Sequence, residues 1–291
     1  MTFNEGMQID TSTTSTGGGG GGRRLAIGGG AGGLLVLVVA LLFGVNPDDV
    51  TGAQQAPQQQ QPGFDTSQCR TGADANRILE CRVIATGNSL DGIWPTLLPN
   101  YSRPRLNLFT NAVNTGCGAA DTSVGPFYCP VDQTVYIDTA FYDELTSRFG
   151  SSGGPLAQEY VVAHEYGHHV QNLVGDLGRA QQGAQGAQGN GVRTELQADC
   201  YAGVWAHHAA VTTQPGTDVT YLKPLSDADI ADALSAAAAV GDDHIQQQAT
   251  GRVNPEAWTH GSSEQRQHWF TEGYRTGDPN SCDTFSARDL G

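Results

Sequence analysis

The sequence predicts an α+β fold in which helices dominate, with a small β-sheet, preceded by a single transmembrane helix. Two segments in the first half of the chain, RLNLFTNAVN and QTVYIDTAF, carry β-branched and aromatic residues near turn residues, as short strands do. The second half is mostly helical in character, and strands followed by helices are typical of the α+β class. Residues 25–45 carry no charge, as a helix that crosses a membrane requires.

The amino-terminal part is expected to lie outside the folded domain. Residues 1–24 are polar and glycine-rich, so we expect a disordered cytoplasmic tail. Residues 25–45 match the roughly 20 residues that a helix needs to cross a bilayer. The arginines directly before them place the amino terminus on the cytoplasmic side of the cell membrane. A cleaved signal peptide, which would give a secreted protein, is the alternative. Both interpretations export the carboxyl-terminal part, which follows a Gln/Pro-rich linker at 46–68.

Residues 69–291 are expected to form one folded domain. Ser226 and Ser262 are expected to cap the amino termini of two helices, and Gly175 is expected to end another. We expect helices at about 71–98, 155–174, 192–210, 226–240 and 262–275.

The cysteines indicate an oxidising compartment. There are six, an even number, and none forms a C-x-x-C pair, which argues against a structural zinc ribbon. Cys69 with Cys81 and Cys117 with Cys129 have the same spacing, as local disulfide loops would, and Cys200 and Cys282 remain as a long-range pair. Many other pairings of six cysteines are open, so this set is a preference.

The charge balance argues against one class of partner. The formal net charge is −15, from 30 acidic and 15 basic side chains. A nucleic-acid-binding protein needs a basic face to neutralise phosphates, so we expect no nucleic-acid partner.

The segment VVAHEYGHHVQNLVG carries the motif H-E-x-x-H, from His164 to His168. On a helix these two histidines lie about 40° apart around the axis and one turn apart along it, so both can reach one metal ion, with Glu165 beside them. A buried structural helix is the alternative, but its histidines would lie among the apolar residues. The apolar stripe lies roughly opposite, and His169 is turned away from the metal-facing side. The stripe consists of Val162, Ala163, Tyr166, Val170 and Leu173.

A catalytic zinc ion needs three protein ligands and an open position. The segment RTELQADCYAGVWAHHA offers Glu195 as the third ligand, with Asp199 one turn later on the same face. Asp199 is placed to accept a hydrogen bond from a ligand histidine and so fix its orientation. Small residues further along this face, and Gly203 beside it, would let the helix approach the first one closely. The alternative is that both acids are solvated surface residues.

His260 opens the segment THGSSEQRQHWF, just before an expected helix. A loop there could enter the site, where His260 could donate a hydrogen bond to a developing oxyanion. A structural role is the alternative.

Together these segments resemble the bacterial family of putative neutral zinc metallopeptidases, whose members are typically membrane-anchored. The resemblance rests on VVAHEYGHHVQNLVG, RTELQADCYAGVWA, GCGAADTSVGPFYCPVDQTVYID and HGSSEQRQHWFTEGY, and it covers about residues 70–285. It implies a zincin-like metallopeptidase domain, with Zn2+ held by His164, His168 and Glu195 and with Glu165 as the catalytic acid/base. It supplies no substrate.

The sequence therefore predicts a membrane-anchored, extracytoplasmic zinc peptidase that hydrolyses peptide bonds with Glu165 as general base. Its partners would be a protein or peptide substrate and the membrane, and QTVYID is expected to be an edge strand that pairs with extended substrate. The alternative is an envelope binding or assembly factor that holds metal but has little or no catalytic activity.

Overall fold

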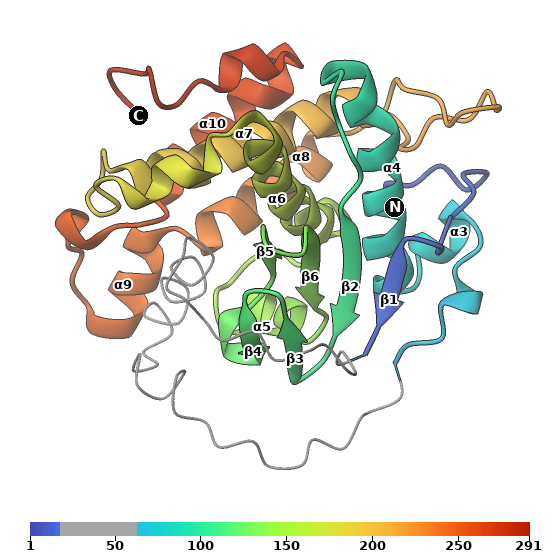
Figure 1. Cartoon of the computed structure of the whole chain (residues 1–291), viewed down its shortest axis with the longest axis horizontal. Coiled ribbons are helices and arrows are strands. Elements are labelled where there is room, and N and C mark those ends of the chain that lie inside the picture. Colours follow the sequence, from blue (N-terminus) through green and yellow to red (C-terminus); the bar gives the residue numbers. More distant parts are fainter. Residues whose placement is uncertain (18–62) are drawn as a thin grey trace.

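The structure is a computed structural model that describes residues 1–17 and 63–291. Long helices cross at its centre (Figure 1). α6 (Pro155–Val174) packs against α4 (Leu79–Leu97), α7 (Asn190–Ala209) and α8 (Asp227–Ala239). α7 also packs along α10 (Ser263–Thr276). A Cβ atom at Gly203 of α7 would lie 2.0 Å from the carbonyl oxygen of Phe270 in α10, so the expected close approach at Gly203 is to α10 and not to α6.

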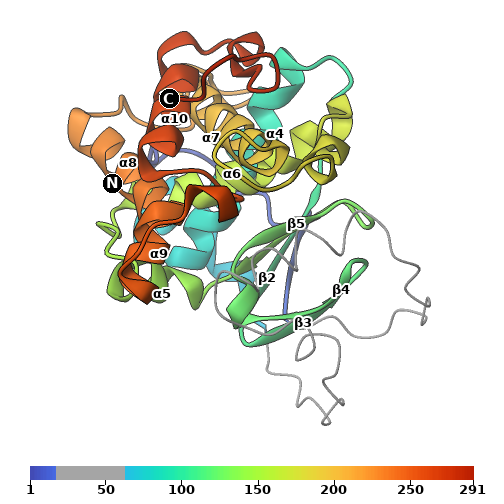
Figure 2. The same cartoon turned by 90° about the vertical axis from the view of Figure 1, so that its left-hand side faces the viewer.

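The strands lie on one side of this helical body (Figure 2). The larger sheet has the order β1-β2-β6-β5, in which the first three strands are parallel and the fourth is antiparallel to its neighbour. Its strands are β1 (Thr14–Thr16), β2 (Arg105–Phe109), β6 (Thr134–Asp138) and β5 (Phe127–Cys129). The predicted edge strand QTVYID is β6, which lies between two neighbours. That prediction was wrong, because the shorter β5 covers its outer side.

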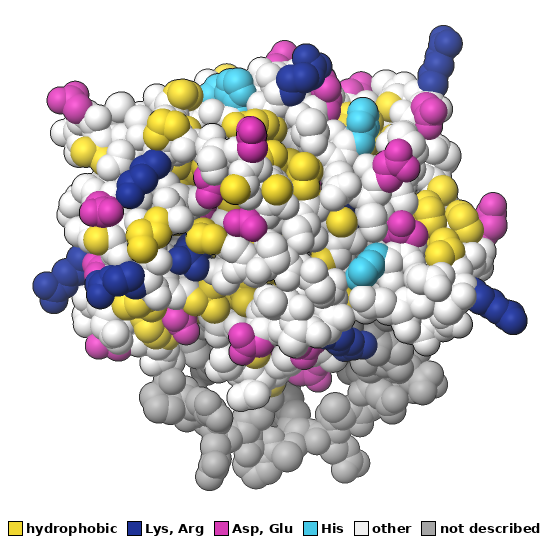
Figure 3. All heavy atoms as spheres, turned by 180° about the vertical axis from the view of Figure 1, so that it is seen from behind, with side chains coloured by type: hydrophobic (Ala, Val, Ile, Leu, Met, Phe, Trp, Pro, Cys, Tyr) yellow, Lys and Arg dark blue, Asp and Glu magenta, His cyan; other side chains and the backbone are white. Residues whose placement is uncertain are grey.

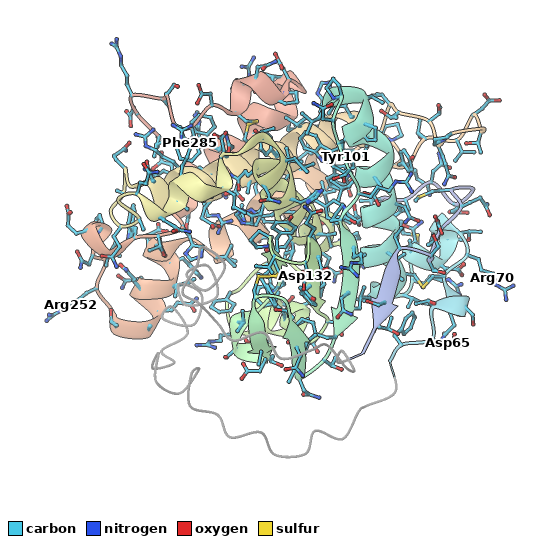
Figure 4. All side chains as sticks on the ribbon, in the orientation of Figure 1. Asp65, Arg70, Tyr101, Asp132, Arg252 and Phe285 are labelled. Carbon is cyan, nitrogen blue, oxygen red and sulfur yellow. A yellow bond between two sulfur atoms is a disulfide. The ribbon has the colours of Figure 1, made fainter. Side chains whose placement is uncertain are left out.

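A separate antiparallel hairpin consists of β3 (Ala112–Thr115) and β4 (Gly118–Asp121). Asp132, on the turn between β5 and β6, joins the hairpin to the larger sheet (Figure 4). Its Oδ2 atom accepts hydrogen bonds from the Gly116 amide at 2.7 Å and the Tyr136 hydroxyl at 2.8 Å. The disulfide Cys117–Cys129 makes a second, covalent connection.

The predicted helices and caps agree well with the structure. α6 has the expected bounds and ends at Gly175, which has the left-handed φ of 88°. The side chains of Ser226 and Ser262 cap α8 and α10. The region 71–98 holds two helices, α3 (Gly72–Ala75) and α4. Two further helices were not predicted, α5 (Phe141–Ser147) and α9 (Asp242–Thr250).

The three preferred disulfides are all present: Cys69–Cys81, Cys117–Cys129 and Cys200–Cys282. No cysteine among the described residues is free. On the face seen in Figure 3, the basic side chains are scattered among acidic ones.

The expected disorder of residues 1–24 is wrong for residues 1–17. Phe3 and Met7 are completely buried in the main core, and β1 pairs in parallel with β2 (Figure 1). The average composition of this segment is polar, but two apolar side chains and backbone pairing suffice to attach it. The end of the predicted linker is also ordered, since Asp65 caps a short 3-10 helix at Thr66–Gln68.

The predicted fold also has to be corrected for its transmembrane helix. Within residues 1–17 and 63–291, every helix is too short or too polar to cross a membrane. The two longest helices, α6 and α7, carry buried polar side chains such as His164 and Glu195, which a membrane-spanning helix would not carry. What the structure supports is a helix-dominated domain with two small sheets. The stretch 25–45 lies outside the described residues.

Candidate metal centre

Helix α6 presents His164 and His168 on one side, one turn apart. Their rings lie 4.7 Å apart between centroids and are nearly perpendicular. Both side chains are buried, with 7% and 4% of their surface exposed. In each ring the Nδ1 atom has a protein partner, so Nε2 is the atom that remains available to a metal ion.

Helix α7 brings Glu195 to these two nitrogen atoms. Its Oε2 atom lies 3.2 Å from His164 Nε2, and its Oε1 atom lies 3.6 Å from His168 Nε2. In a tetrahedral zinc site with ligand bonds of about 2.1 Å, neighbouring ligand atoms are about 3.4 Å apart. The ligand atoms of all three residues lie within 4.8 Å of one another. The spacing and the donor types therefore fit zinc.

A close contact between α6 and α7 makes this arrangement possible. Gly167 lies within the H-E-x-x-H motif, and a Cβ atom there would lie 2.9 Å from the carbonyl oxygen of Ala198. Any larger residue would push α7, and with it Glu195, away from the histidines. The glycine in the motif thus sets the distance between the two helices that supply the ligands.

The orientation of His164 is fixed by a buried group of polar side chains. Its Nδ1 atom lies 2.8 Å from Oδ1 of Asp199, which has no exposed surface. Arg266 of α10 donates to both oxygens of Asp199, from Nε at 2.8 Å and from Nη2 at 3.0 Å, and Tyr160 donates its hydroxyl to Oδ1. An ionised Asp199 accepts from Nδ1–H, which leaves the Nε2 lone pair of His164 for the metal.

The orientation of His168 is fixed by Gln171. The amide nitrogen of Gln171 donates to the Thr194 carbonyl oxygen at 2.6 Å and to Oε1 of Gln197 at 2.9 Å. The amide oxygen must therefore face His168, and its Oε1 atom lies 2.8 Å from Nδ1. Because an amide oxygen can only accept, Nδ1 carries the hydrogen and Nε2 again carries the lone pair.

Acidic side chains concentrate negative charge at the metal site. Burial alone would lower the pKa of His164, but Asp199 and Glu195 outweigh burial and raise it to about 10. Burial would raise the pKa of Glu195, but His168, His260 and His164 outweigh it, so this pKa falls well below its usual range. Glu195 is thus ionised, and a divalent cation can displace the proton that the carboxylates hold on His164.

Glu165 and His260 line the same cleft as the three ligand residues. Burial raises the pKa of Glu165, and the two ligand histidines offset only part of this effect. His260 lies on the loop before α10, held by Asp242 at the start of α9. The Oδ2 atom of Asp242 accepts the backbone N–H groups of Thr259, His260 and Gly261, at 2.7 to 3.0 Å. The structure therefore brings all the predicted site residues together.

Four residues of the site were not predicted: Gln171, Arg266, Tyr160 and Asp242. Gln171 could have been found, since it lies one turn after His168 on the same helix. Tyr160 could have been found too, since it lies one turn before His164 on the same helix. Arg266 and Asp242 meet the site only through the tertiary fold. His169, by contrast, is buried away from the ligands, where its ring nitrogens lie 3.0 Å from the Tyr128 hydroxyl and 2.6 Å from the Ser102 carbonyl oxygen.

The comparison with protein families agrees with this geometry. The family described as "putative neutral zinc metallopeptidase" matches residues 4–285. The chain belongs to this family. The match begins in the amino-terminal segment that packs on the domain, and it includes every residue of the metal centre. Zinc is the cofactor that the family implies, and the two imidazoles and one carboxylate are a donor set that suits it.

Similar proteins have been found in several bacteria. An uncharacterized protein of Mycobacterium tuberculosis, Rv2575, and one of Mycobacterium bovis, Mb2605, are each 71% identical over 293 residues, which covers 100% of both chains. The uncharacterized protein YpfJ of Escherichia coli is 48% identical over 190 residues, which covers 64% of this chain and 62% of YpfJ. No solved structure matches the chain.

Replacing Glu195 by alanine should remove most of the zinc affinity. Loss of a group that only orients a ligand typically costs about 10- to 100-fold in affinity, so loss of a ligand should cost more than about 100-fold. The measurement is zinc content by elemental analysis, followed by competition with a chelator. Glu264→Ala, at an exposed position of α10, is the matched control and should keep its zinc. Equal zinc in the Glu195→Ala variant would refute this ligand.

Proposed function

We propose that this protein is a zinc-dependent endopeptidase. The observation that carries the proposal is a single cleft lined by the three ligand residues, by Glu165 and by His260. A metal site that only stabilises a fold is closed by four protein ligands, whereas a catalytic site leaves one position open to the cleft. Family membership supports the same conclusion, since the family description names a metallopeptidase.

His164, His168 and Glu195 would hold zinc, which would supply Lewis acidity and lower the pKa of a bound water molecule. Glu165 takes a proton as water attacks the peptide carbonyl and then delivers it to the leaving amine. The raised pKa of Glu165 suits both steps, because a base whose pKa lies nearer to neutrality holds the transferred proton better.

His260 donates a hydrogen bond to the carbonyl oxygen as negative charge develops on it. Burial alone would lower the pKa of His260, but Glu195 and Asp242 outweigh burial and raise it. The Nδ1 atom lies 3.6 Å from Oδ1 of Asp242 and 3.0 Å from the Thr259 hydroxyl oxygen. These partners hold the ring from one side, so the Nε2–H group is the one available to a substrate.

Strand β5 positions the substrate main chain. It is the outermost strand of the larger sheet on the side of the metal centre, and residues 125–128 line the cleft. An extended peptide that hydrogen-bonds to such an edge is held without regard to its sequence. This role replaces the one predicted for QTVYID.

The domain works outside the reducing cytoplasm. The described chain holds three disulfides, two that close local loops and one that joins Cys200 to Cys282, and disulfides persist in oxidising compartments. Residues 1–17 share this location, because they pack into the same core. Fractionation of cells under conditions that trap free thiols would test this location. Recovery of the chain in the cytosol with six reduced cysteines would contradict it.

Metal removal tests the activity. The full chain is loaded with zinc, stripped with a chelator, or stripped and reloaded, and each sample is incubated with a mixture of peptides from a bacterial proteome. New peptide termini are detected by mass spectrometry. We expect cleavage only in the two samples that hold zinc. If the zinc-loaded chain produces no more termini than the stripped chain, the protein is a metal-binding factor without peptidase activity.

A further inference from the structure

The cleft beside the metal ligands extends into a region with apolar walls. The volume of the whole cleft, metal centre included, is about 120 Å³. The walls come from four separate parts of the chain: the segment that leads into β5, helix α5 with the turn after it, the end of α8, and α9. The side chains that form these walls include Val124, Phe127, Phe141, Leu145, Val240 and Ile245.

Every charged side chain of the cleft is already used by the metal centre. His164, His168 and Glu195 are the ligands, and Glu165 and His260 face the reacting bond. Arg266 also lines the cleft, but its guanidinium donates to both oxygens of Asp199 and to the Tyr160 hydroxyl at 3.2 Å. Arg266 is only 3% exposed, so it offers no free donor to a substrate carboxylate. The apolar part of the cleft thus holds no partner for a charged substrate side chain.

We infer that this region is a specificity pocket for a bulky apolar side chain, such as that of leucine, methionine or phenylalanine, next to the scissile bond. The inference rests on the proposed peptidase function. The pocket and the ligands share one continuous cleft, so a substrate whose carbonyl group lies at the metal places a neighbouring side chain against these walls.

The expected selectivity follows from burial. Removing a large aliphatic or aromatic side chain from water favours binding by about 10- to 100-fold over a small one. A charged side chain buried without a partner loses its hydration, which disfavours it further. Between leucine and aspartate at this substrate position, kcat/KM should therefore differ by at least about 100-fold.

Ile245 offers a way to change the preference. It lies on α9, is only partly buried and faces the cleft, so a larger polar side chain can be accommodated there. Ile245→Arg should lower kcat/KM for leucine peptides at least tenfold and raise it for aspartate and glutamate peptides. Ala249→Arg, one turn later on the same helix at an exposed position outside the cleft, should keep the wild-type profile.

The test profiles both variants and the zinc-loaded wild-type chain on a peptide library in which each position next to the scissile bond is varied. Enrichment of bulky apolar residues at one position, and its loss only in Ile245→Arg, would support the pocket. Cleavage without such a preference, or an unchanged profile for Ile245→Arg, would overturn it. Both variants should keep zinc content and a thermal unfolding midpoint close to those of the wild type.

A binding measurement separates failure of the pocket from failure of the peptidase proposal. The zinc-loaded Glu165→Gln variant is titrated with two hydroxamate-ended peptides that differ only in leucine against aspartate. Tighter binding of the leucine peptide, by about tenfold or more, supports the pocket even if no peptide is cleaved by the wild type. Equal binding of the two peptides overturns the pocket even if the wild type is an active peptidase.

Discussion

Glu165→Gln should abolish peptide hydrolysis and leave the zinc content unchanged. Glu165 lines the cleft beside the ligands but is not one of the three residues whose donor atoms converge. Glutamine has almost the same shape and cannot take a proton from water. General base catalysis contributes about 10²- to 10⁴-fold, and here the same group also returns the proton to the leaving amine. We expect kcat/KM to fall by about 10³-fold or more.

The assay uses the peptide that the wild-type chain cuts fastest, with zinc content measured on the same samples. Glu264→Gln, on the exposed side of α10, is the control and should keep full activity. If the Glu165→Gln variant cleaves as fast as the wild type, the proposed mechanism is wrong. If it loses both activity and zinc, Glu165 acts on metal binding and not as the base.

The metal centre could be predicted in large part from the sequence, because its first three residues lie on one helix. His164, Glu165 and His168 follow one another within two turns, so helix geometry alone places them. Glu195 could be found because its helix carries a second acid, Asp199, four residues later, the same spacing as between His164 and His168. Arg266 and Asp242 could not be found, because their contacts join residues far apart along the chain, such as Arg266 with Asp199.

The helices and strands that could and could not be predicted differ in the strength of their own sequence signals. Helix α6 has strong signals throughout, from its apolar stripe to the left-handed glycine at its end. Helix α9 has the sequence DDHIQQQAT, in which Ile245 is the only large apolar residue, so its periodicity is too weak to detect. Strand β1 has only three residues and exists because β2 provides a partner for it. Such elements depend on tertiary contacts that composition does not show.

Deleting residues 1–17 should strongly destabilise the domain. Phe3 and Met7 have no exposed surface, and each fully buried side chain of this size contributes about 1.5–3 kcal/mol. The side chain of Asn76 accepts from the Phe3 amide at 3.1 Å and donates to the Phe3 carbonyl oxygen at 2.9 Å. The Thr2 hydroxyl donates to Glu159, which is completely buried on α6. Without the segment, an apolar surface and a buried acid are left uncovered.

The loss of these two side chains alone should lower the unfolding midpoint by about 10 °C for a domain of this size. The measurement is thermal unfolding of the full chain and of a chain that begins at residue 18. Phe3→Ala should reproduce part of the effect, whereas Glu5→Ala, at an exposed position of the same segment, should change little, since the surface ion pair of Glu5 with Lys223 is weak. An unchanged midpoint after the deletion would show that the segment adds nothing to the fold.

The same experiment bears on where the amino terminus lies. The Thr16 hydroxyl donates to the Phe64 carbonyl oxygen at 3.0 Å, so the described chain on the two sides of residues 18–62 meets at one point. A segment that stabilises the zinc domain must occupy the same compartment as that domain. If the midpoint falls as expected, a cytoplasmic tail and an exported domain cannot both be right for the folded protein.

A cysteine placed at exposed Glu5 and one at exposed Glu264 should then react equally with a thiol reagent that does not cross the cell membrane. Unequal labelling would show that residues 1–17 leave the domain in the cell.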